Sequence, residues 1–128
     1  MKSKTLTVSI DCSPKKVYAF VSNAKNLPKW AKTFCKSVKK TGRQWLMNTS
    51  LGPLKLRFAP KNNLGVLDHF IKPPKGQDIV VPMRVISNGK TSEVVFTLFQ
   101  RPGMTDADFY RDIGMVQQDL KTLRAALE

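Results

Sequence analysis

Several residue types that commonly carry chemistry are scarce in this chain. Its 128 residues include only two cysteines, Cys12 and Cys35, which form no Cys-x-x-Cys pair, and only one histidine. These numbers exclude the common zinc patterns. A chain that is 41% hydrophobic can bury a core without support from a disulfide or a metal, so we expect the two thiols to be reduced. We therefore expect no metal and no cofactor.

Missing sequence motifs and missing apolar segments narrow the possible functions of the protein and its expected location in the cell. The chain has no Gly-x-Ser-x-Gly motif, no glycine-rich phosphate loop and no dinucleotide fingerprint. No apolar run approaches the length of a membrane span. Met1-Lys2-Ser3-Lys4 at the N-terminus provides no apolar signal segment. We expect a cytoplasmic protein without a membrane span.

Acidic residues are also few, which leaves a large positive charge. Against 22 Lys and Arg there are 9 Asp and Glu, so the net charge is +13. Residues 1–43 hold eleven Lys and Arg and a single acid, Asp11. Such a field attracts polyanions, and nucleic-acid binding through this basic third is one alternative. The lysines are scattered singly, with no strip of interleaved aromatics, so a solvated surface explains them better.

The pattern of apolar residues predicts strands followed by one long helix. Strands are expected at 5–10, 34–40, 44–50, 54–58, 65–71, 78–86 and 91–100, and short helical segments after Ser13-Pro14 and around Trp30. Asn88-Gly89 predicts a hairpin turn between the last two strands. From Thr105 to Glu128 a helical stripe consists of Phe109, Ile113, Val116, Leu120, Leu123 and Leu127. Only a sheet is large enough to bury that stripe, which indicates one α+β domain over residues 1–128.

The order of these elements resembles the helix-grip fold of the START-like superfamily, also called SRPBCC. Residues 10–18 and Leu27-Pro28-Lys29-Trp30 are similar to the opening of polyketide cyclase/dehydrase-like members. Residues 67–69, 82–85, 92–99 and 101–104 resemble small uncharacterised bacterial proteins of that superfamily. The resemblance implies a curved antiparallel sheet of about six to seven strands, two short helices after the first strand, and a long C-terminal helix across the sheet. The resemblance predicts the fold but does not decide whether the protein is a carrier, a cyclase or a chaperone activator.

A two-residue Asn88-Gly89 turn also predicts which side chains share a face. It places Arg84 opposite Glu93 and Val80 opposite Thr97, and the simplest register of the preceding loop adds His69 to that row. An apolar wall with a few convergent polar groups is typical of a ligand pocket. The opposite face is more apolar, however, so the pattern alone puts these polar residues outside. Trp30, Trp45, Met47, Phe58 and Met83 are candidates for either a pocket lining or a core.

Three functions remain open. The first is binding of a hydrophobic small molecule or lipid between the sheet and the C-terminal helix, with His69, Arg84, Glu93, Thr97, Trp45, Met47 and Phe58 as candidate ligand-binding residues. The second is a cyclase or dehydratase-like enzyme in which His69 or Glu93 transfers protons. The third is polyanion binding. A homodimer is expected if both faces of the sheet are apolar enough to need cover.

Overall fold

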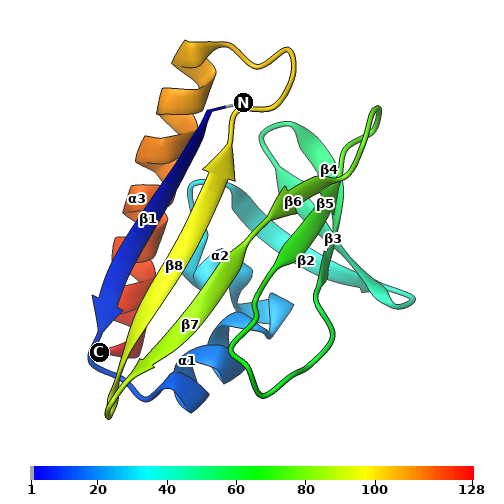
Figure 1. Cartoon of the computed structure of the whole chain (residues 1–128). Helices are drawn as coiled ribbons and strands as arrows, with labels where there is room; N and C mark the ends of the chain where they lie inside the picture. The colour runs from blue at the N-terminus through cyan, green and yellow to red at the C-terminus, as the bar shows by residue number, and fades with distance from the viewer. Residues whose placement is uncertain (1) are drawn as a thin grey trace.

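The computed structural model describes residues 2–128 and shows an antiparallel sheet wrapped against a long helix (Figure 1). The strands are β1 (Ser3–Ile10), β2 (Cys35–Thr41), β3 (Gln44–Thr49), β4 (Gly52–Phe58), β5 (His69–Lys72), β6 (Ile79–Val81), β7 (Met83–Asn88) and β8 (Thr91–Phe99). The helices are α1 (Pro14–Val21), the 3-10 turn η1 (Ala24–Asn26), α2 (Leu27–Trp30) and α3 (Asp106–Leu127). The α+β architecture predicted from the sequence is confirmed.

The strands form a three-stranded part, β1-β8-β7, and a five-stranded part, β2-β3-β4-β5-β6. The predicted strand at 78–86 is split into β6 and β7 at Pro82, which has no N–H to donate to a ladder. The two parts are nevertheless joined. The Thr97 N–H donates to the Pro82 carbonyl, and the Leu67 N–H donates to the Met83 carbonyl. The sheet therefore changes direction at Pro82, with one concave and one convex face.

Gly65 allows the close approach that this junction needs. Its φ of 73° lies in the left-handed region, and its carbonyl accepts from the Val85 N–H at 2.9 Å. A Cβ at this position would lie 2.3 Å from the Val85 carbonyl oxygen. Any other residue here would push β7 away from the segment that precedes β5.

The long helix α3 covers the concave face as its apolar stripe predicts. Phe109, Leu120 and Leu123 are buried, and the other predicted stripe residues are half-buried (Ile113, Val116 and Leu127). The Thr105 side chain caps the helix by accepting from the Asp108 N–H at 3.1 Å. At the other end Glu128 accepts from the backbone N–H of Asp11, just after β1. None of the helices in residues 2–128 has the length and apolar content that a membrane span requires.

A buried carboxylate fastens α3 to the turn before β2. Asp119 accepts from the Thr33 N–H at 3.1 Å and from the Thr33 hydroxyl at 2.7 Å. Burial raises the pKa of Asp119, and the two Thr33 bonds oppose that rise. Asp119 is therefore a polar anchor in a mostly apolar stripe, which periodicity alone does not reveal.

The substitution Thr33→Val tests this anchor. It removes a donor from a buried carboxylate, so we expect a loss of about 1–3 kcal/mol of unfolding free energy near neutral pH. Removing the donor also raises the folded-state pKa of Asp119 further. The loss should therefore shrink as the pH falls towards the ordinary Asp value of 3.8, where the carboxyl takes up a proton in both states. Urea unfolding at several pH values measures this loss of unfolding free energy. Thr33→Ser is the control, because it keeps the hydroxyl. A loss that does not change with pH would contradict the role of Thr33 as a donor to Asp119.

Candidate functional site

The structure divides the predicted site residues between the two faces of the sheet. Trp45, Met47, Phe58 and His69 lie on the concave face, as shown by their cross-strand partners. Arg84, Glu93 and Thr97 lie on the convex face, away from them. The prediction that His69 shares a face with the other three polar residues is therefore wrong.

Two shifts in register explain this difference. Asn88 pairs with Thr91, so the hairpin turn consists of Gly89 and Lys90 rather than Asn88 and Gly89. Arg84 then lies opposite Val95 instead of Glu93; a shift of two residues leaves the face of Arg84 unchanged. His69 pairs with Val81 rather than being level with Val80, and this one-residue change moves its ring to the other face.

The polar side chains of the convex face form hydrogen bonds with other residues of the protein. Arg84 donates from Nε and Nη2 to the two carboxylate oxygens of Asp68, at 3.0 and 2.9 Å. This pairing, not the predicted one with Glu93, holds the pKa of Asp68 below its usual range. Glu93 accepts from the Ser9 hydroxyl at 2.6 Å. These residues are paired within the sheet, and Glu93 cannot share a proton relay with His69 on the opposite face.

The concave face instead carries continuous rows of side chains across the five-stranded part. One row passes from Lys40 on β2 to Trp45, then to Leu56 and Ile71, each directly opposite the next. A neighbouring row joins Phe58 to His69. The middle of this face is filled by its own fully buried side chains (Met47, Leu56, Leu67 and Met83).

His69 lies in a buried part of the concave face. It is 7% exposed, and its ring lies 5.4 Å from that of Phe58 and 6.0 Å from that of Phe96. Burial lowers the pKa of His69, while the Leu67 carbonyl and the nearby Asp68 act more weakly in the other direction. The Leu67 carbonyl only accepts, so Nδ1 carries the proton of the 3.1 Å bond. The neutral ring then presents Nε2 as an acceptor, and no residue in 2–128 donates to it.

Trp30 adds a donor to the same interior. Its side chain on α2 is 3% exposed, and its Nε1–H is buried without an acceptor among residues 2–128. Such an unpaired buried donor costs about 1–3 kcal/mol. The sequence marks Trp30 only as an apolar residue, because nothing in a sequence tells which buried groups will lack a partner.

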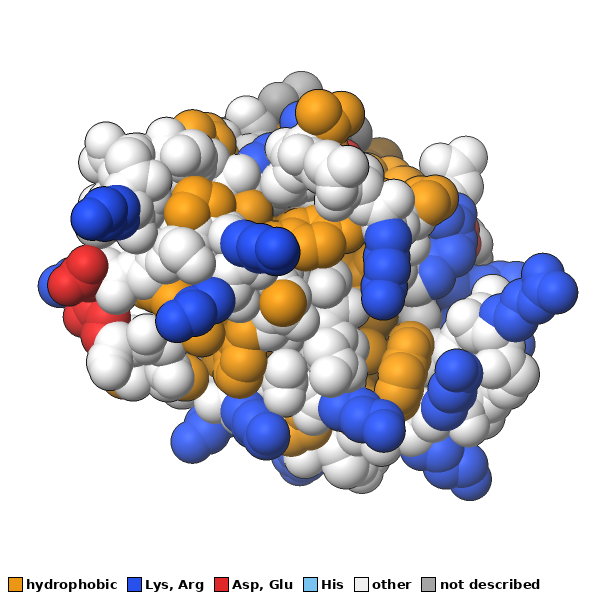
Figure 2. Space-filling view, turned by 90° about the horizontal axis from the view of Figure 1, so that it is seen from below, with side chains coloured by type: hydrophobic (Ala, Val, Ile, Leu, Met, Phe, Trp, Pro, Cys, Tyr) orange, Lys and Arg blue, Asp and Glu red, His pale blue; other side chains and the backbone are white. Residues whose placement is uncertain are grey.

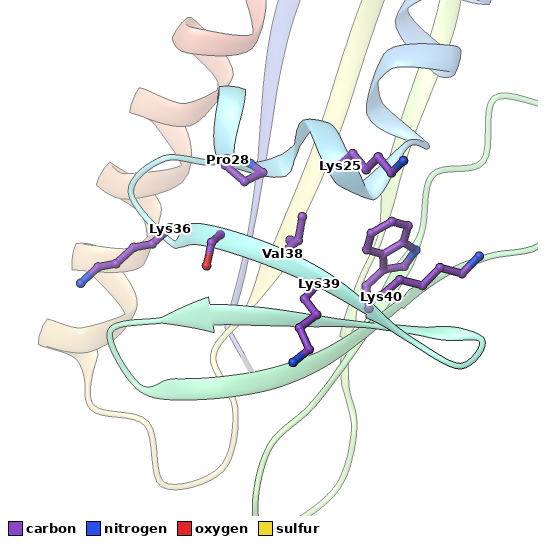
Figure 3. Close-up of a pocket in the computed structure, with 8 residues that line it drawn as sticks. Lys25, Pro28, Lys36, Val38, Lys39 and Lys40 are labelled. Atoms are coloured by element: carbon purple, nitrogen blue, oxygen red, sulfur yellow. The ribbon is translucent and has the colours of Figure 1, made fainter.

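The concave face opens to solvent beside β2 as a groove of about 650 Å³ (Figure 3). Its walls are β2 on one side and the η1–α2 segment on the other, with Trp45 at its inner end. The side chains around it are Lys25, Pro28, Lys36, Ser37, Val38, Lys39, Lys40 and Trp45. Sequence reasoning named only Trp45 of this set. Val38 and Lys40 are two residues apart on β2 and therefore share a face, which was the available signal.

The described residues offer little for metal or nucleophilic chemistry. Residues 2–128 bring together no group of three or more His, Cys, Asp and Glu that could hold a metal ion. Both cysteines are free thiols, and burial raises the pKa of Cys35 to about 11, which keeps it protonated.

The pH dependence of stability should report the buried state of His69. Its folded-state pKa is lowered, so the unfolded chain takes up a proton first as the pH falls below about 6.5. Wild type should therefore lose stability between about pH 7 and pH 5 by more than His69→Phe does. Urea unfolding of both proteins measures the difference, in which the shared carboxylates cancel. A difference that stays constant over this range would show that His69 is solvated.

Comparison with known proteins supports the fold. No protein-family model and no curated protein sequence matches the chain. Among solved structures it is similar to XoxI from Bacillus cereus, with a TM-score of 0.77 and 20% identity over 99% of this chain and 96% of that one.

Two further structures show the same architecture. The Aha1 dimer from Colwellia psychrerythraea gives a TM-score of 0.78 at 16% identity, over 100% of this chain and 97% of that one. A START superfamily protein from Mycobacterium smegmatis gives 0.73 at 12%, over 98% and 99%. The chain therefore has the helix-grip fold seen in START and Aha1 proteins, as its sequence predicts.

Proposed function

We propose that this protein binds a hydrophobic small molecule or lipid between the concave face of its sheet and α3. The observation that supports this most directly is the Trp30 Nε1–H donor, which is buried without an acceptor in the described part of the chain. The His69 Nε2 acceptor also has no partner there. Buried polar groups are normally paired within a protein. An acceptor on the ligand would satisfy Trp30, and a donor such as a hydroxyl would satisfy His69.

The packing of the concave face sets how such a ligand would enter. The middle of the face is filled, whereas its outer end beside β2 is open as the groove. An apolar molecule would first contact Pro28, Val38 and Trp45 and then displace the flexible side chain of Met47, which lies directly opposite Val38. Entry from this side leaves α3 in place with its Asp119 anchor intact.

Native mass spectrometry of the protein purified without denaturation should show a bound apolar molecule, or uptake of an added one. A matched pair of ligands, 2-naphthol and naphthalene, then tests the polar groups by calorimetry. Wild type should bind naphthol about three to ten times more tightly, the value of one net hydrogen bond. His69→Phe should lose that preference and keep its affinity for naphthalene.

Failure of the wild-type protein to bind either ligand, together with the absence of any adduct, would contradict the proposal. Loss of affinity for naphthalene as well as naphthol in His69→Phe would show that the substitution disturbs packing. In that case Trp30→Phe, which removes the other polar group together with part of the ring volume, should still lower the preference for naphthol.

We also propose that a second copy of the chain covers the convex face. Ile86 on β7 and Phe99 on β8 are exposed there on adjacent strands, and Val80 on β6 is exposed as well. Apolar side chains gathered on one exposed face are typical of an interface.

Light scattering coupled to gel filtration tests this second proposal. Ile86, which is 50% exposed, should contribute to the interface, so Ile86→Lys should shift the protein towards the monomer. Leu51→Lys is the control, because Leu51 is 74% exposed in the turn between β3 and β4, outside the convex group. A wild-type protein that stays monomeric at every concentration would contradict the dimer.

A further inference from the structure

The groove beside β2 combines an apolar floor with a cationic rim. Pro28, Val38 and Trp45 provide the apolar surface, and Lys25, Lys36, Lys39 and Lys40 surround it. Its volume of about 650 Å³ lies within the range of small-molecule sites. An apolar floor under ammonium groups is complementary to a molecule that has an apolar chain and a negative head.

The positive charge at the groove is not neutralised by the protein itself. No Asp or Glu lines the groove, and none occurs in the sequence between Cys12 and Leu67, which includes both of its walls. The ion pairs within residues 2–128 involve Lys2, Arg84, Arg111 and Arg124, and none of the four groove lysines. An anion at the groove would therefore meet no competing carboxylate.

The four lysines do not play the same role. Lys40 lies directly opposite Trp45, so it belongs to the concave face, whereas Lys39 lies opposite Leu46 on the other face. Figure 3 shows Lys25 and Lys40 extending to the same end of the groove, while Lys36 and Lys39 point away from it in other directions. Lysines on the free edge of β2 also hinder pairing with other strands, which is an ordinary role for Lys36 and Lys39.

We propose that Lys25 and Lys40 bind the carboxylate of an amphipathic anion, such as a fatty acid, whose chain lies over Val38 and Trp45 towards the concave face. This inference rests on the proposed function and names its ligand class. The two lysines come from different elements, η1 and β2, and Lys40 lies at the outer end of a row of apolar side chains, Trp45 to Leu56 to Ile71. A head held at the rim would keep its charge in water while the chain is buried.

The face of the molecule seen from below argues against an extended polyanion as the occupant. Figure 2 shows Lys and Arg side chains standing singly over the face seen from below, with hydrophobic side chains between them and acidic ones at one edge. A nucleic acid would need a continuous cationic track with exposed aromatic platforms. A single headgroup needs only the two lysines at one end of the groove.

The experiment compares decanoate with 1-decanol, which has the same chain length and no charge. Calorimetry at low ionic strength and about pH 8, where the carboxylate is ionised, measures both affinities. Wild type should bind decanoate about ten times more tightly, the value of a charge-assisted hydrogen bond. The double variant Lys25→Gln/Lys40→Gln should lose this preference while binding decanol as before.

Lys36→Gln/Lys39→Gln is the matched control, because it removes the same charge from the same groove and should keep the preference. Equal loss in both double variants would mean that only diffuse charge attracts the anion, which overturns the proposal. Equal binding of decanoate and decanol by wild type would also overturn it and leave the proposed function standing, whereas no binding of either would contradict both. An oligonucleotide that displaces decanoate at lower concentration would identify the groove as a polyanion site.

Discussion

The burial of the concave face under α3 is the constraint on which the rest of the structure depends. The helix buries its apolar stripe there, and two polar contacts fix its position: Asp119 with Thr33 near α2, and Glu128 with the backbone of Asp11. The same interior buries His69 between Phe58 and Phe96, which lowers its pKa, and leaves the Trp30 indole without a partner among the described residues. The unusual chemistry of the interior is thus a result of its burial.

The two faces of the sheet have opposite hydrogen-bonding character. On the convex face the polar side chains are paired, with Arg84 on Asp68 and Glu93 on Ser9, so they define the surface without offering free groups. In the interior beneath the concave face few polar groups are present, and Trp30 Nε1 on α2 and His69 Nε2 on β5 have no partner within residues 2–128. Binding specificity is expected where a partner is missing, because a correct ligand gains a hydrogen bond that the protein lacks.

The sequence was sufficient for the fold and insufficient for the site, for physical reasons. The stripe of α3, the Ser13 cap of α1 and the alternation along β4 are local patterns, and the structure confirms each of them. The face of His69 depended on the register of a loop and on the break at Pro82, where a one-residue error moves a side chain to the other face. The lack of a partner for Trp30 and the presence of Lys25 and Lys40 on one groove arise only from tertiary packing.

The break at Pro82 also determines how the two parts of the sheet are joined. A continuous ladder would resist bending, but here the two parts meet through few backbone bonds around Gly65, Leu67 and Pro82. The contact between the His69 and Phe96 rings spans this seam, since one belongs to β5 and the other to β8. The Arg84–Asp68 ion pair and the Met83 N–H bond to Asp68 add side-chain contacts across the same seam. The proline that interrupts the strand thereby transfers part of the joining of the sheet from backbone to side chains.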